Sequence, residues 1–190
     1  MNRIADDVRE FHAAFGQPLG PPPGGVTAER AALRNALIEE ESDELGEAVL
    51  AGNLVDIADA LADIVYVAYG TALEFGIDLD RAVAYALPYA DAYLPISRMM
   101  AAVQRLCAAT TSRNVPAVAH RLARVARLAD LIAARYGIPL DAVLAEVHRS
   151  NMSKLDADGQ PVYRADGKVM KSDLYSPPDI AGVLERRVTA

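Results

Sequence analysis

Two long stretches without proline, joined by a Gly-Asn turn, constrain the fold of this chain more than any other feature. Residues 28–51 contain no proline and one internal glycine, and Gly52-Asn53 is a sequence that ends a helix. Residues 54–75 follow with apolar side chains at helical spacing, at Ile57, Leu61, Ile64, Ala68 and Ala72. This pattern predicts two long helices that lie antiparallel about the turn.

The rest of the chain is also mainly helical in pattern. Apolar periodicity and helix-ending glycines predict helices at about 4–15, from about 79, at about 96–111, 115–136 and 140–151, and a short one after Ser176-Pro177-Pro178-Asp179. Turn sequences at 156–159 and 164–167 predict a small hairpin or loop in the tail. The expected fold class is all-α, a helical bundle with a short irregular or hairpin tail.

A short sequence recurs within the chain. GIDLD at 76–80 returns as GIPLD at 137–141, and the same offset of 61 pairs Asn53 with Asn114 and Leu61 with Leu122. An internal duplication predicts these matches, whereas two unrelated helical hairpins of similar length are the alternative. We therefore expect one domain over 1–190, with an acidic half at 28–80, a degenerate repeat at 96–141 and a C-terminal tail at 152–190.

The two halves differ in their charged residues. Glu40, Glu41 and Glu44 align with Ala101, Ala102 and Arg105, and Asp59 and Asp63 align with His120 and Arg124. The second half should therefore bind no metal of its own. If the halves pair about a pseudo-twofold axis, Arg105 or Arg124 is expected near the first half's acids; the alternative is that both point to solvent.

Composition excludes several classes of protein. The net charge is −7 and the pI is about 4.9, so nothing predicts nucleic-acid binding. Cys107 is the single cysteine and can form no internal disulfide. No apolar run approaches the roughly 18 residues that a membrane span requires. We expect a cytoplasmic protein with neither a nucleic-acid nor a membrane partner.

Acidic residues form one face on each of the two long predicted helices. Glu40, Glu44 and Glu47 share a face with Glu41 on its flank, and Asp56, Asp59 and Asp63 follow at i, i+3 and i+7. Around a turn at Gly52 these two faces meet, and carboxylates at such range repel one another unless a cation binds. The alternative is a solvated acidic surface.

The kind of metal follows from the ligands. All-oxygen carboxylate sets favour Mg²⁺ or Mn²⁺. A di-iron bundle would require a Glu-x-x-His pair on two helices, and His12, His120 and His148 are not placed in that way. Mg²⁺ held by carboxylates commonly serves to bind the phosphates of a substrate.

At this point the sequence resembles the all-α nucleoside triphosphate pyrophosphohydrolases: MazG-type enzymes, phosphoribosyl-ATP pyrophosphohydrolase and the dimeric dUTPases. Their E-E-x-x-E motif is present in full at 40–44. Their E-x-x-D motif is present only in Asp63, with Ala60 at the glutamate position and Asp59 as the candidate substitute. Segments 66–80, 146–154, 165–171 and 175–179 resemble later parts of the family.

The resemblance implies a Mg²⁺- or Mn²⁺-dependent attack of water on the α-phosphorus of a (d)NTP, giving the monophosphate and pyrophosphate, in a reaction that could serve to remove unwanted nucleotides. It implies metal binding by Glu41, Glu44, Asp59 and Asp63, with Glu40 as general base or as a further metal ligand. The candidates for polyphosphate binding are Asn151, Lys154, Lys168 and Lys171, the lysines being otherwise ordinary exposed residues. Relatives are dimers or tetramers, so a homo-oligomer, a dimer, is expected. The alternative function is a non-catalytic nucleotide- or metal-binding module.

Overall fold

The computed structural model describes residues 3–86, 96–163 and 170–188, and this part of the chain confirms the all-α fold class. Its helices are α1 (Ile4–Ala14), α2 (Ala28–Ala51), α3 (Leu54–Phe75), α4 (Leu79–Tyr85), α5 (Ile96–Thr111), α6 (Val115–Tyr136), α7 (Leu140–Met152) and α8 (Ile180–Val188). In the tail, the described residues form an isolated antiparallel bridge between Leu155 and Pro161 around the turn at 156–159. The second expected turn, 164–167, lies outside the described residues.

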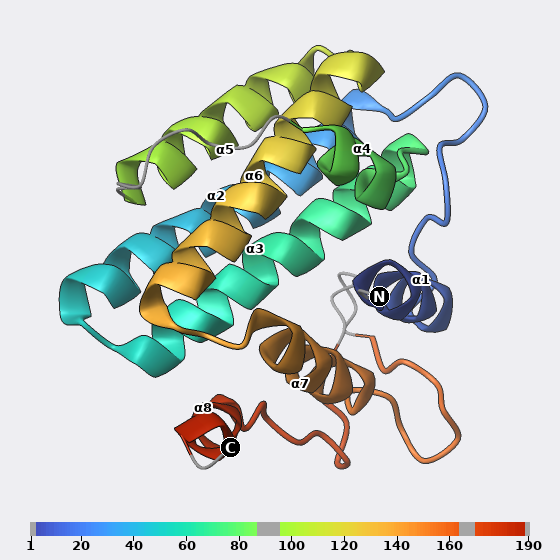
Figure 1. The fold of residues 1–190 in the computed structure, drawn as a ribbon. Helices are drawn as coiled ribbons and strands as arrows, with labels where there is room; N and C mark the ends of the chain where they lie inside the picture. Colours follow the sequence, from blue (N-terminus) through green and yellow to red (C-terminus); the bar gives the residue numbers. More distant parts are fainter. Residues whose placement is uncertain (1–2, 87–95, 164–169, 189–190) are drawn as a thin grey trace.

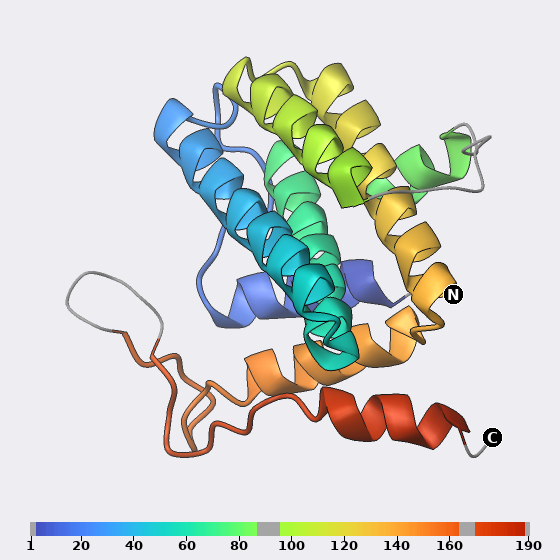
Figure 2. The ribbon, with the colours of Figure 1, turned by 90° about the vertical axis from the view of Figure 1, so that its left-hand side faces the viewer.

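Four long helices form a bundle with α3 at its centre. The helices α2, α3, α5 and α6 run side by side, while α1 and α7 cross one end of the bundle and α8 lies beside α7 (Figures 1 and 2). The central helix packs against α1, α2, α6, α7 and α8, which explains why most of its side chains are buried. The acidic face of α3 is therefore held in place from several sides.

The ends of α2 and α3 follow from their sequences. The Thr27 side chain caps α2 by accepting a hydrogen bond of 3.2 Å from the backbone N–H of Arg30. Gly52 ends α2 in the left-handed region at φ 67°, and the Asn53 side chain then caps α3 by accepting from the backbone N–H groups of Val55 and Asp56. The predicted antiparallel hairpin is confirmed, with the turn where the sequence placed it.

The helix boundaries repeat at the offset of 61 residues. Helices α3 and α6 both contain 22 residues, begin after an asparagine that caps them (Asn53 or Asn114) and end at a glycine, Gly76 or Gly137, with φ 68° and ψ 32°. In the bundle, α3 packs against α6 and α2 packs against α5. Each helix thus contacts its own counterpart, as an internal duplication with a pseudo-twofold axis predicts.

A buried ion-pair network joins α2 to α3 below the acidic faces. Glu74 is 1% exposed and accepts two hydrogen bonds of 2.6 Å from Arg30, while Nη1 of Arg34 lies 3.6 Å from it. Arg34 also donates to Thr71 Oγ1 and to the Val67 carbonyl. Burial lowers the pKa of Arg34 to about 10, with Glu74 opposing this effect. The network therefore fixes the distance and register between the two helices that carry the site.

The lengths and compositions of the described helices bear on whether they could span a membrane. None of them is long and apolar enough on its own to cross a membrane; only α3 and α4 together reach that length and composition, and they are bent by 110°.

Candidate functional site

The acidic faces of α2 and α3 meet, as the sequence predicts. Glu40 and Glu44 are exposed on α2, and Glu41 is half-buried beside them. On α3, Asp59 and Asp63 are half-buried one turn apart, so they share a face. The structure thus brings together the five predicted metal ligands, Glu40, Glu41, Glu44, Asp59 and Asp63.

The electrostatics of these carboxyl groups reflect their crowding. Burial raises the pKa of Glu41 to about 8, with further contributions, largest first, from the carboxylates of Asp63, Glu44, Glu40 and Asp59. Burial likewise raises the pKa of Asp63 to about 7, followed by repulsion from Asp59. Glu44 and Asp59 also have raised pKa values, with burial as the largest cause. Negative charge is therefore costly here, and a bound cation would reduce that cost.

The family's second motif glutamate has no equivalent in the site. Ala60 stands at that position, is 3% exposed and packs in the hydrophobic core. Asp59 lies four residues before Asp63, a spacing that places two side chains about 40° apart around a helix. Asp59 is also the neighbouring charge with the largest effect on the Asp63 pKa. It therefore supplies a carboxylate on the face where Ala60 supplies none.

A lysine from the C-terminal segment reaches the same site. Lys154 is half-buried just after α7, and its Nζ donates a hydrogen bond of 2.7 Å to Oδ1 of Asn151. Its positive charge opposes the rise of the Asp63 pKa. Burial is the main cause that lowers the pKa of Lys154, partly offset by Tyr175, Asp63 and Glu41. Two of the predicted phosphate-binding residues, Asn151 and Lys154, thus lie beside the carboxylates.

The two remaining predicted lysines are placed differently. Lys171 is exposed, its Nζ lies 4.3 Å from the centroid of the Tyr175 ring, and its charge lowers the pKa of Lys154. It is therefore near the site, at its open side. Lys168 lies outside the described residues. Arg105 and Arg124, the arginines expected near the acids under a pseudo-twofold pairing, line a cavity between α5 and α6.

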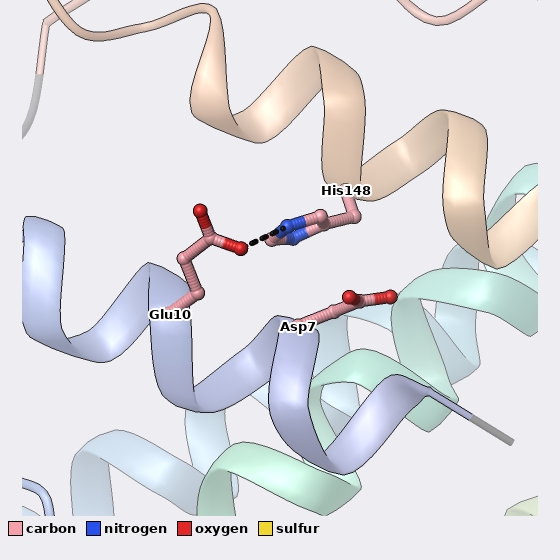
Figure 3. Close-up of side chains that lie close together, drawn as sticks. All are labelled: Asp7, Glu10 and His148. Carbon is pink, nitrogen blue, oxygen red and sulfur yellow. Dashed lines mark hydrogen bonds and ion pairs between the residues drawn. The ribbon is translucent and has the colours of Figure 1, made fainter.

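A second group of possible metal ligands joins α1 to α7, and sequence reasoning missed it. Asp7, Glu10 and His148 each offer a ligand atom within 4.8 Å of the others, and Nε2 of His148 lies 3.3 Å from Glu10 (Figure 3). Among the described residues no other trio of this kind is so close, and the carboxylates of α2 and α3 are spread more widely. The only signal in the sequence is the i, i+3 spacing of Asp7 and Glu10, because their meeting with His148 depends on how α1 and α7 pack.

A tyrosine connects this second group to the first. The Tyr66 hydroxyl lies 3.0 Å from Nδ1 of His148, and Tyr66 is on α3 less than one turn after Asp63. The nearby Asn151 side chain opposes the rise in the Tyr66 pKa that burial causes. Tyr66 therefore lies between the Asn151–Lys154 pair and His148, so both groups belong to one polar region where α1, α3 and α7 meet.

This all-α bundle, in which α2 and α3 present clustered carboxylates to a lysine from a later segment, is consistent with a MazG-like helical bundle. The sequence model of the phosphoribosyl-ATP pyrophosphohydrolase family matches residues 8–85, from α1 to the end of α4. Residues 8–85 are therefore similar to that MazG-like family of all-α pyrophosphohydrolases. The match ends before α5, so the degenerate half lies outside it.

One relative spans both halves. "Uncharacterized protein L479" of Acanthamoeba polyphaga mimivirus is 26% identical, and the match covers 94% of each chain. Its name assigns no activity, so the similarity extends over the chain without adding a substrate. No solved structure matches this chain.

Proposed function

We propose that the protein is a divalent-metal-dependent nucleoside triphosphate pyrophosphohydrolase. The observation that carries the proposal is the crowding of Glu41 and Asp63, whose raised pKa values reflect burial and mutual repulsion that a bound cation would offset. The similarity of residues 8–85 to a pyrophosphohydrolase family supports the reaction class. The choice of a (d)NTP as substrate and of Mg²⁺ or Mn²⁺ as metal belongs to the proposal.

The residues fit such a metal by their chemistry. Glu41, Glu44, Asp59 and Asp63 offer only carboxylate oxygens, the ligands that Mg²⁺ and Mn²⁺ prefer. When bound, the metal would neutralise phosphate charge and make a water molecule more acidic. Binding would also remove the repulsion that raises the pKa values of these groups.

The chain's own residues then have separate tasks. Glu40 is exposed at the edge of the cluster, where it can accept the proton of the attacking water. Water adds to the α-phosphorus, the bond from that phosphorus to the bridging oxygen of the β-phosphate breaks, and pyrophosphate leaves. Lys154, held by Asn151, would bind the phosphates, and Lys171 would approach them from the open side.

Product analysis tests this proposal. The full chain is incubated with a panel of canonical and modified (d)NTPs and Mg²⁺ or Mn²⁺, and monophosphate and pyrophosphate are quantified. Equal amounts of the two products, formed only with metal, are expected. Release of orthophosphate would place cleavage at another bond and contradict the proposal. Nucleotide binding without turnover, which the absence of a glutamate at Ala60 favours, would identify a non-catalytic binding module.

A further inference from the structure

The hairpin of α5 and α6 has the opposite charge to its counterpart. Helices α2 and α3 together contain eleven acidic residues and two basic ones. Helices α5 and α6 contain one acidic residue and six arginines. The net charge of −7 for the whole chain is therefore not evenly distributed, because the α2–α3 hairpin is negatively charged and the α5–α6 hairpin is positively charged.

Four of these arginines line one cavity of about 260 Å³ between α5 and α6. Arg98 and Arg105 are seven residues apart on α5, and Arg121 and Arg124 are three apart on α6, so each pair lies on one helix face. Ala101 and Ala102 line the cavity between the first pair. No acidic residue is among the described residues that line it.

The cavity occupies the position that the repeat gives to the acidic site. At the offset of 61 residues, Arg105 corresponds to Glu44 and Arg124 corresponds to Asp63. Ala101 and Ala102 correspond to Glu40 and Glu41, and these short side chains leave space between the helices. Where the first half offers oxygen ligands to a cation, the second half offers guanidinium groups around a hollow.

Guanidinium groups gathered around a cavity suit one class of ligand. The planar guanidinium donates two parallel hydrogen bonds to phosphate oxygens, which a strongly hydrated lysine ammonium cannot do. Buried Ala102 and Leu128 add an apolar wall to the cavity.

We propose that this cavity binds a phosphate-bearing anion of at least two phosphate groups, at a site separate from the acidic one. The same chemistry could come from free pyrophosphate or from the polyphosphate of a nucleotide. This proposal is independent of the proposed hydrolysis, because it concerns binding by the second half of the chain.

Calorimetric titration in EDTA tests the site without activity at the acidic cluster. The full chain is titrated with pyrophosphate, with a non-hydrolysable nucleoside triphosphate analogue and with the nucleoside alone. We expect one pyrophosphate or analogue per chain, no binding of the nucleoside, and weaker binding at higher salt. Tighter binding of the analogue than of pyrophosphate would identify the nucleotide as the source. Absence of binding by both phosphate compounds would overturn the proposal.

Variants locate the binding. R105Q and R121Q should each weaken it at least tenfold, R105K and R121K should weaken it less, and circular dichroism monitors their folding. R135Q, at the exposed end of α6, is the matched control and should bind as the original chain does. Loss of binding in K154M, or equal loss in R135Q, would place the ligand elsewhere and refute the site.

Discussion

Arg113 adopts the left-handed backbone conformation, at φ 53°, that Gly52 adopts at φ 67° in the equivalent turn 61 residues earlier. Among the described residues, Arg113 is the one non-glycine residue with positive φ. The turn between α5 and α6 thus has the conformation of the turn between α2 and α3 without the glycine that favours it.

This relationship predicts whether each of two substitutions raises or lowers the free energy of unfolding. Arg113→Gly should raise the free energy of unfolding by up to about 1 kcal/mol. A side chain in the left-handed region costs roughly 1–2 kcal/mol, and glycine avoids that cost. Part of the benefit is offset because glycine loses more conformational entropy on folding than arginine does. Gly52→Ala should lower the free energy of unfolding by about 1 kcal/mol for the same reason. Urea denaturation measures both changes. An Arg113→Gly variant less stable than the original chain would show that the arginine side chain stabilises the turn.

The acidic cluster predicts which carboxylates are needed for turnover. Glu41→Gln, Glu44→Gln and Asp63→Asn should each reduce metal-dependent hydrolysis at least a hundredfold, roughly 3 kcal/mol or more in transition-state stabilisation. Circular dichroism should show unchanged helix content, because the substitutions remove repulsion. Asp43→Asn, exposed on another face of α2, is the control and should retain activity. Normal turnover in all three variants would remove the site from these helices.

The raised pKa values predict how stability without metal depends on pH. Folded Glu41 and Asp63 keep their protons up to pH values of about 8 and 7, whereas the unfolded chain loses them near pH 4–5. Between these values the folded state binds more protons, so the free energy of unfolding falls as pH rises. The burial-lowered pKa of His12 acts in the opposite sense below pH 6.5. The cleanest window is therefore pH 6.5–8.5.

Thermal melts in EDTA across that window measure the effect. The melting temperature should decrease from pH 6.5 to 8.5, and Glu41→Gln should reduce the slope while Asp43→Asn leaves it unchanged. Added Mg²⁺ should stabilise most at the alkaline end, because the metal binds the ionised carboxylates. A melting temperature that rises with pH in EDTA would show that the cluster is not protonated.

The buried network predicts a large loss of stability from one conservative change. Glu74→Gln keeps the shape but leaves Arg34 buried without its carboxylate partner, which should cost about 3–5 kcal/mol. Glu29→Gln, at an exposed position of α2, is the control and should leave the free energy of unfolding nearly unchanged. Urea denaturation measures the free energy of unfolding of both variants. If Glu74→Gln were as stable as Glu29→Gln, the hydrogen bonds from Arg34 to Thr71 and Val67 would be sufficient to stabilise its buried charge.

The sequence predicts most of the fold because local signals mark the helix ends. Thr27, Asn53 and Asn114 cap helices through their own side chains, and Gly52 and Gly137 end them in a conformation that glycine favours. These are interactions between neighbours in the chain, so they can be inferred without the tertiary structure. In the described part of the tail, Leu155 pairs with Pro161 around the turn at 156–159, and the backbone N–H of Met170 donates to the Val162 carbonyl, so the local turn signal there also predicts backbone pairing.

The site is predictable only where its residues share a hairpin. Glu41 and Asp63 follow from helical periodicity around one turn, and their catalytic and metal-binding roles stay predictions. The contact of Asp7 and Glu10 with His148 joins segments about 140 residues apart and depends on how α1 and α7 cross the bundle. Likewise, the repeat shows that Arg105 replaces an acid, but the cavity it lines is formed by the packing of α5 on α6.

The pairing of α3 with α6 and of α2 with α5 within one chain has a genetic consequence. In a symmetric dimer every substitution appears on both faces, so an acid cannot be exchanged for an arginine on one side alone. Two halves encoded in tandem change one at a time. One half can keep its carboxylates while the other acquires cationic side chains. Identical subunits cannot differ in charge in this way.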